Sequence, residues 1–204
     1  MNFASFREKI GYQPLLLGTF ALLASGALAW ASNATGEAIA AAEAKDLRDS
    51  LAEVLPKGFA DNDFLNDKLE IERNGKPVTI YRARQGEAVK GAVFKVAERG
   101  YAADIQLLMA VDAEGRTLGV RVIKHAETPG LGDKIEVKKA PWILGFDGKS
   151  LGDPEPEKWG VKKDGGIFDQ FAGATITPRA VVKAVKGGLD FYAMHRKEIL
   201  GEKS

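Results

Sequence analysis

Hydrophobic and polar positions divide the chain into parts with different periodicities. Residues 14–31 contain no charged side chain, and extending this segment to Gly11 and Ala34 gives the ~20 residues that a membrane-spanning helix needs. Tyr12 and Trp30 lie near its two ends, where interfacial aromatic residues are common. The pattern predicts one N-terminal transmembrane helix.

The main alternative for this segment is a cleaved signal peptide, because Ala-Trp-Ala at 29–31 fits the small-x-small cleavage pattern. The apolar run is at the long limit for a signal peptide, so we favour a retained anchor. Arg7 and Lys9 precede the span, and Glu37 and Glu43 follow it. Basic flanks stay in the cytoplasm, so we expect a cytoplasmic N-terminus and a periplasmic remainder, in the inner membrane.

After the span, the spacing of apolar residues changes twice. Ile39, Leu51 and Val54 fall on one face of a helix that ends before the Pro-Lys-Gly at 56–58. Short alternating segments then predict strands, and Asn74-Gly75 is a hairpin-turn signal. The clearest predicted strands are 88–96, 102–112 and 117–124, and Glu114-Gly115 joins the second to the third. Tyr101, at the entry to the second, is either a core edge residue or faces a ligand, and Trp142 and Trp159 are either core or pocket wall.

The last periodic segment is helical. Val181, Val185 and Leu189 recur at helical spacing, which predicts a helix from about Pro178 towards Ile199. The short connections between strands imply antiparallel pairing. A sheet with helices before and after it predicts an α+β fold. We therefore expect an N-terminal tail and transmembrane helix at 1–32 and one domain at 33–204.

The composition excludes several classes of function. Net charge is +1, from 29 basic and 28 acidic residues, so there is no electrostatic case for nucleic-acid binding. The chain has no cysteine for disulfides or an iron–sulfur cluster, and only His125 and His195 for a histidine metal site. It also lacks a Gly-x-Gly-x-x-Gly fingerprint for a nicotinamide cofactor. Any redox group must be organic or belong to a partner.

Candidate chemistry lies at the start of the last helix, in residues 169–179. Thr177 precedes a proline and is predicted to be the N-cap. Gly173-Ala174 allows a bulky group to approach the backbone. Thr175 then places a hydroxyl beside the helix N-terminus, where the dipole favours an anion such as phosphate. An ordinary capped helix without a ligand fits the composition as well.

A second informative stretch follows the strand at 117–124. Glu127-Thr128-Pro129-Gly130-Leu131-Gly132 predicts a sharp turn whose exposed backbone groups suit the polar edge of a planar heterocycle, with Leu131 against one face. A surface turn without a ligand is the alternative. For His125 we favour a hydrogen-bonded residue at a strand end over a catalytic base, since it has no evident nucleophile partner.

These residues carry a resemblance to a known family. Asp169 followed by Gly173-Ala174-Thr175 resembles the flavinylation motif of the FMN-binding domain in Rnf-type electron-transport complexes, a domain that also occurs in the sodium-pumping NADH:quinone oxidoreductase, in its C subunit. The layout is most similar to the G subunit of the Rnf-type complex. The resemblance implies a phosphodiester between Thr175 and FMN, made by a separate flavin transferase that recognises Asp169 as part of the motif. Ala172 departs from the family, which usually has Ser or Thr there.

The loop at 127–132 resembles the flavin-pocket segment of the same family. Two separated matches in the expected order strengthen each other. The resemblance implies that the FMN-contacting residues besides Thr175 are Gly173, Ala174, Glu127, Thr128, Gly130, Leu131 and Gly132.

The resemblance also implies a function. The chain would be a membrane-anchored flavoprotein subunit that carries electrons between ferredoxin and NAD, in a complex with other membrane subunits that moves ions. No independent catalytic activity is expected of the isolated chain. One alternative is a stand-alone anchored or secreted flavin-binding or sensory domain. Another is a flavin-free structural protein in which Thr175 only helps cap a helix.

Overall fold

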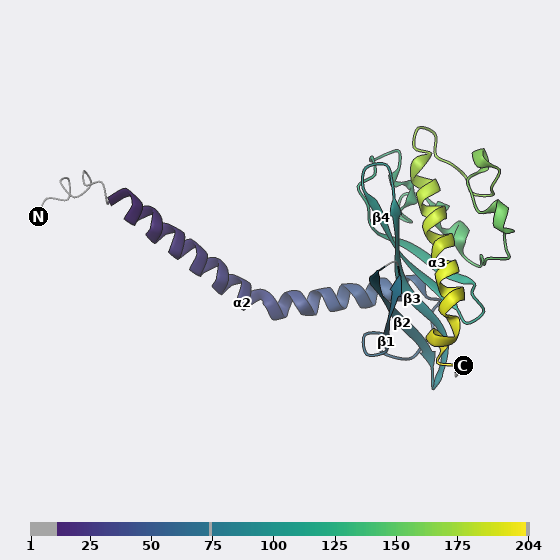
Figure 1. Ribbon diagram of the computed structural model, residues 1–204, viewed down its shortest axis with the longest axis horizontal. Coiled ribbons are helices and arrows are strands. Elements are labelled where there is room, and N and C mark those ends of the chain that lie inside the picture. The colour runs from purple at the N-terminus through teal and green to yellow at the C-terminus, as the bar shows by residue number, and fades with distance from the viewer. Residues whose placement is uncertain (1–11, 74, 203–204) are drawn as a thin grey trace, which may run out of the picture. The chain divides into compact units, whose positions relative to one another are not determined.

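The computed structural model describes residues 12–73 and 75–202 (Figure 1). The chain divides into two compact units, Met1–Asp46 and Leu47–Ser204. Helix α2 (Tyr12–Val54) begins in the first unit and ends in the second, and the other elements belong to the second unit. A boundary between residues 32 and 33 stays a prediction.

The first unit has the surface of a membrane-spanning helix. Tyr12–Gly36 of α2 is long and apolar enough to cross a membrane, by length and composition. Large apolar side chains such as Leu17 and Trp30 are exposed there, so they are not used in a protein core. The predicted N-terminal apolar helix is confirmed. The charges at Arg7 and Lys9, which predict its orientation, lie outside the described residues.

The second unit is built on a five-stranded sheet in which each strand pairs antiparallel with the next along the chain. Glycines with positive φ stand between successive strands: Gly75 (+74), Gly86 (+60) and Gly115 (+87). This confirms the predicted α+β fold with an antiparallel sheet, although Asn74 of the first turn lies outside the described residues. The strands are β1 (Lys68–Arg73), β2 (Lys76–Gln85), β3 (Ala88–Arg99), β4 (Asp104–Asp112) and β5 (Thr117–Lys124).

Two helical segments cover the two faces of this sheet. Leu107 and Met109 of β4 belong to the main core together with α3 (Ile176–Leu200), which lies along β3 and β4 (Figure 1). Leu108, between them, packs instead with Val54 at the end of α2. The alternation follows from the strand period of two. Gly188 lets α3 approach closely, since a Cβ there would overlap the Met109 side chain.

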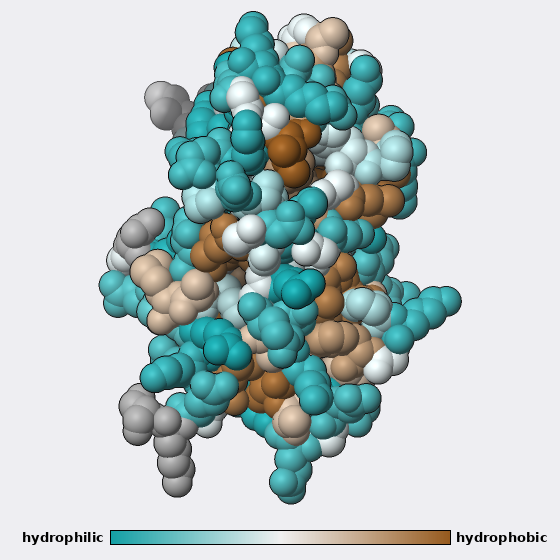
Figure 2. All heavy atoms as spheres, turned by 90° about the vertical axis from the view of Figure 1, so that its right-hand side faces the viewer, coloured by the Kyte–Doolittle hydropathy of each residue, from teal (hydrophilic) through white to brown (hydrophobic). Residues whose placement is uncertain are grey.

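Between β5 and α3 the chain forms short 3-10 helices around an aromatic cluster. Phe146 lies 4.4 Å from Phe168, and Trp142 lies 5.1 Å from Phe171, between ring centroids. Trp159 completes the cluster as a buried core residue, while Trp142 is partly buried and packs against this core. Neither tryptophan lines the pocket described below. The face shown in Figure 2 is mostly hydrophilic, with small apolar patches between. The short helices are η1 (Asp133–Ile135), η2 (Pro141–Phe146), η3 (Pro156–Lys158) and η4 (Lys162–Asp164).

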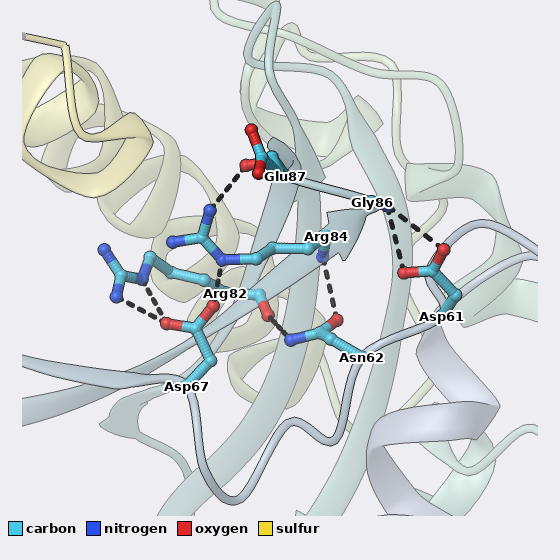
Figure 3. A network of polar contacts seen from close by, with 7 residues as sticks. All are labelled: Asp61, Asn62, Asp67, Arg82, Arg84, Gly86 and Glu87. Atoms are coloured by element: carbon cyan, nitrogen blue, oxygen red, sulfur yellow. Dashed lines mark hydrogen bonds and ion pairs between the residues drawn. The ribbon is translucent and has the colours of Figure 1, made fainter.

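A polar network attaches the segment between α2 and β1 to strand β2 (Figure 3). The Asp67 carboxylate accepts hydrogen bonds from the side chains of Arg82 and Arg84. The side-chain amide of Asn62 donates to the carbonyl of Arg82 at 2.9 Å and accepts from the N–H of Arg84 at 2.8 Å. Burial raises the pKa of Asp67, but the hydrogen bonds and charges of the two arginines outweigh it and hold this pKa below its ordinary 3.8.

Candidate functional site

Two loops that are far apart in the sequence meet beside the N-terminus of α3. A pocket of about 240 Å³ lies between them. All the predicted contact residues except Gly130 lie in its wall. The wall consists of Tyr101, Glu127, Thr128, Leu131, Gly132, Gly173, Ala174, Thr175, Ile176 and Thr177.

The loop that carries Thr175 reaches α3 through a tight turn. The backbone N–H of Ala174 donates to the carbonyl oxygen of Phe171 at 3.1 Å. Gly173 has φ +78, the left-handed region that the third residue of a type II turn requires. Thr175 follows as the half-buried N-cap of α3, and its side chain makes no capping hydrogen bond. Thr175 therefore lies in the pocket wall, and its hydroxyl makes no capping hydrogen bond to the helix.

Thr177 does not have the role predicted for it. The sequence predicts Thr177 as N-cap and Pro178 as the first helical residue, whereas α3 begins at Ile176. Thr177 is 1% exposed, and its hydroxyl donates to Oε2 of Glu127. A buried hydroxyl needs a partner, and this carboxylate supplies one. The predicted cap is therefore wrong by two positions.

The opposite loop, between residues 127 and 133, turns back on itself. The carbonyl oxygen of Thr128 accepts hydrogen bonds from the N–H groups of Leu131 at 3.1 Å and Gly132 at 3.0 Å. Gly130 has φ +79 and shapes this turn without lining the pocket. A Cβ at Gly132 would lie 2.8 Å from Cβ of Glu127. Glycine is thus required at 130 by backbone conformation and at 132 by close packing.

Glu127 links the elements around the pocket. Its side chain is buried, with 4% exposure for the residue. Oε1 accepts hydrogen bonds from the backbone N–H groups of Tyr101 at 3.0 Å and Ala102 at 3.3 Å, while Oε2 accepts from Thr177. These donors belong to the turn between β3 and β4 and to the first turn of α3. Both oxygens are thus engaged by the protein, and contact between Glu127 and FMN stays a prediction.

His125 stands directly after β5, behind the pocket wall. Its Nδ1 accepts the N–H of Glu127 at 3.1 Å, so Nε2 carries the ring hydrogen and donates to Oε1 of Glu136 at 3.0 Å. The expected hydrogen-bonded histidine at a strand end is confirmed. Within residues 12–73 and 75–202, no group of three or more His, Asp or Glu side chains is placed to hold a metal ion.

Sequence reasoning missed part of the pocket wall. It left Tyr101 open between a core edge and a ligand contact, and it assigned no contact to Ile176. In the structure Tyr101 is 68% exposed and Ile176 is 48% exposed, and both line the pocket. A signal existed for each: Tyr101 follows the glycine of a strand connection, and Ile176 is an apolar residue next to Thr175.

Asp169 of the sequence motif lies away from the pocket. Its exposed carboxylate pairs with Nζ of Lys162 at 2.6 Å. Its backbone carbonyl accepts a hydrogen bond from Nε1 of Trp142 at 2.9 Å. The structure therefore holds Asp169 at the surface, and recognition of this residue by a flavin transferase stays a prediction.

Comparisons with known proteins agree with this arrangement. The family described as the FMN-binding domain matches residues 100–190, a range that contains every residue of the pocket wall. The chain is 51% identical over 187 residues to the G subunit of the ion-translocating oxidoreductase complex of Cereibacter sphaeroides, covering 91% of this chain and 85% of that protein. The chain belongs to this G-subunit family.

Membership in the G-subunit family extends over almost the whole chain. The G subunit of the same complex in Pseudomonas aeruginosa is 46% identical over 203 residues, covering 97% of this chain and 95% of that protein. This coverage includes the N-terminal helix as well as the pocket. The predicted resemblance to the G subunit is confirmed.

Solved structures show weaker similarity. NqrC from Shewanella oneidensis has a TM-score of 0.49 and 22% identity, covering 72% of this chain and 74% of that one. The C subunit of the Na⁺-translocating NADH-quinone reductase from Parabacteroides distasonis has a TM-score of 0.44 and 19% identity, covering 63% and 65%. Membership in the G-subunit family rests on the sequence relatives.

Proposed function

We propose that Thr175 carries FMN through a phosphodiester bond and that the adjacent pocket seats the flavin ring as an electron-transfer station. The chain is a membrane-anchored flavoprotein subunit of an ion-translocating oxidoreductase complex. We propose in addition that the domain lies on the periplasmic side of the membrane. In accordance with the resemblance, ferredoxin and NAD would be the two ends of the electron path.

The position of Thr175 at the N-cap of α3 is the observation that supports attachment. Its side chain makes no capping hydrogen bond, so the hydroxyl is available for a covalent bond. The first turn of the helix offers the N–H groups of Ile176 and Thr177, while Pro178 has none. These donors and the helix dipole favour a phosphate at the same place. Thr177 is unsuited as the acceptor because its hydroxyl is buried against Glu127.

Attachment requires an activated FMN donor and a flavin transferase. In the balanced step, the Thr175 oxygen forms a bond to the phosphorus of the FMN part of a flavin dinucleotide, and its proton passes to a base of the transferase. The phosphoanhydride bond breaks, and a nucleoside monophosphate leaves with the bonding electrons. Asp169, exposed and a few residues upstream, is available to the transferase at the surface.

The pocket suits partial burial of a flavin ring. Its volume of about 240 Å³ is below the ~300–1,000 Å³ of pockets that enclose a ligand. Leu131 and Tyr101 are exposed at its rim and supply apolar surface for the ring. FMN itself supplies the reversible uptake of electrons. A partly exposed ring leaves an edge that another protein of the complex can approach.

The decisive test of attachment compares three forms of the full chain produced with a flavin transferase. The wild-type band should fluoresce after denaturing electrophoresis, and its mass should exceed the sequence mass by one FMN less one water. Thr175→Val should be dark, because it keeps the shape and removes the hydroxyl. Thr177→Val is the matched control and should stay fluorescent. A dark Thr177→Val with a fluorescent Thr175→Val would show that the wrong threonine has been chosen.

Membrane orientation needs a separate test. The basic residues Arg7 and Lys9 before the span predict a periplasmic domain. A reporter fused after Ser204 should therefore be active outside the cytoplasm, and carbonate washing should leave the protein in the membrane. A mature chain that begins just after Ala31 would contradict the anchor.

A further inference from the structure

The described residues of the pocket wall carry a negative charge that no cationic side chain among them balances. Among the described residues that line it, Glu127 is the one with a formally charged side chain. The others are apolar, glycine, threonine or tyrosine. A ring seated in this pocket would therefore experience the field of one carboxylate at close range.

The carboxylate of Glu127 is stabilised by neutral donors. It accepts hydrogen bonds from two backbone N–H groups, of Tyr101 and Ala102, and from the hydroxyl of Thr177. In the part of the chain that the structure describes, no Lys, Arg or His nitrogen forms an ion pair with it within 4.0 Å. His125, its neighbour, is oriented to accept the N–H of Glu127, not to face the carboxylate with a charge. The negative charge is thus held in place but not neutralised by a cation.

Two glycines keep this carboxylate in position. A Cβ at Gly100 would lie 2.5 Å from Oε1 of Glu127, and one at Gly132 would lie 3.3 Å from Oε2. The backbone therefore closes around the carboxylate on both sides, and its burial excludes water. A charge that is fixed and poorly solvated acts more strongly on its surroundings than one at the surface.

We infer that Glu127 lowers the reduction potential of the flavin seated in this pocket. Electrons added to the ring bring negative charge next to a carboxylate that cannot move away, so the reduced form is disfavoured relative to the oxidised form. Glu127 is a positioning residue as well, because its hydrogen bonds join the walls of the pocket. The inference rests on the proposed function, since it requires a flavin at this site.

Glu127→Gln separates the charge from the shape. The amide oxygen can accept the two backbone hydrogen bonds, and the amide NH₂ can donate to Oγ1 of Thr177, which then acts as acceptor. Thr177→Val does the opposite, because it removes one hydrogen bond and keeps the charge. Glu136→Gln is the matched control for charge, since Glu136 pairs with His125 and does not line the pocket.

The measurement is a spectroelectrochemical titration of the flavin in the full-length purified chain. We expect a higher reduction potential for Glu127→Gln than for wild type, and smaller changes for Glu136→Gln and Thr177→Val. Thermal unfolding of each variant, produced without the transferase, reports any loss of stability that is independent of flavin. An unchanged potential in Glu127→Gln would overturn the inference. An equal rise in Thr177→Val would also overturn it, by attributing the effect to packing.

The test distinguishes this inference from the proposed function. If the wild-type chain carries no flavin, the proposed function fails before any potential is measured. If the wild type is fluorescent and titrates reversibly but Glu127→Gln has the same potential, attachment at Thr175 stands and only the role of the charge fails. In-gel fluorescence of every variant shows that the compared samples carry the cofactor.

Discussion

Asp67, which is partly buried, and Glu127, which is buried, are carboxylates in the same unit, and they are stabilised in opposite ways. The Asp67 side chain, 16% exposed, contacts the guanidinium groups of Arg82 and Arg84 (Figure 3). Glu127, 4% exposed, is stabilised by two backbone N–H groups and a hydroxyl. One negative charge is compensated by cations, and the other is not.

The difference follows the tasks of the two regions. The network around Asp67 attaches the segment after α2 to β2, where an uncompensated charge would only cost stability. At the pocket, the uncompensated charge of Glu127 lies beside the proposed flavin site. By our inference, the neutral donors leave the charge of Glu127 effective beside the flavin, while the arginines compensate the charge of Asp67 where the fold needs only an attachment. Each variant below tests one side of this comparison.

We expect the largest effect from Gly132→Val. The added Cβ would lie 2.8 Å from Cβ of Glu127 and 3.0 Å from Oγ1 of Thr177, so the pocket must open to admit it. Overpacking typically costs about 1–3 kcal/mol in the free energy of unfolding and occasionally more, and two such overlaps place this variant at the upper end of that range. Denaturant unfolding of the full chain measures the loss. A variant as stable as wild type would show that the loop does not pack against Glu127 as described.

Asp67→Ala tests the compensated side and should cost about 2–3 kcal/mol. The substitution leaves Arg82 and Arg84 without their shared carboxylate, and removing one partner of a partly buried pair costs more than the pair contributes. Flavin fluorescence and potential should stay at the wild-type values, because the network is separate from the pocket residues. A changed flavin reduction potential in Asp67→Ala would show that Asp67 also acts on the flavin, and that Glu127 is not special in this respect.

The same pair predicts a pH dependence. The pKa of Asp67 is lowered on folding, so its contribution to stability is present above its ordinary pKa of 3.8 and is lost as pH falls through the lower, folded pKa. Wild-type stability should therefore decline in this acidic range. In Asp67→Asn the decline should be shallower, which unfolding curves at a series of pH values below about 4 would show. If the free energy of unfolding fell equally steeply with pH in both proteins, Asp67 would not be the group responsible.

Thr177→Val should cost about 2 kcal/mol, the typical value of a hydrogen bond to a charged group. The loss arises at Glu127, which gives up one of its three donors, and not at the helix cap. Thr175→Val, which removes a hydroxyl without a capping hydrogen bond, is the control for stability and should unfold close to wild type in the absence of flavin. A larger loss of stability in Thr175→Val would show that the Thr175 hydroxyl does cap α3.

Gly130→Val should destabilise the domain by only about 1–2 kcal/mol, because a left-handed backbone strains a side chain. The space around Gly130 is open, so no overlap is added to this cost. We expect flavin to stay attached, while the ring environment changes in absorption or potential. A variant identical to wild type in spectrum, potential and electron transfer would remove this loop from the flavin site.

The sequence predicts the sheet and the two loops well because their signals are local. A few adjacent residues are enough to indicate a turn such as Glu114-Gly115 or the helical spacing after Pro178. The contact between Glu127 and Thr177 is of another kind, since it joins residues on separate elements. Local preference for threonine before proline predicted a cap at Thr177, and the tertiary contact with the carboxylate prevailed over it.

The aromatic cluster and the polar network escaped sequence analysis for the same reason. The sequence left Trp142 and Trp159 open between core and pocket wall. Packing around Phe146 places Trp159 in the core and Trp142 against it. Asp67 showed nothing in the sequence that would pair it with Arg82 and Arg84. Residue type gives the chemistry of a side chain, whereas its partner is set by the assembled fold.

The order of the elements along the chain separates two events in maturation. Each strand pairs with the strand made just before it, so the sheet can assemble as the polypeptide emerges, without waiting for distant segments. Helix α3 follows the sheet along the chain, and it supplies both the cover of one sheet face and the Ile176 and Thr177 side of the pocket. A nascent polypeptide that stops before Ile176 has a complete sheet sequence but lacks one side of the pocket, so the proposed flavin site can form only after α3 has been made.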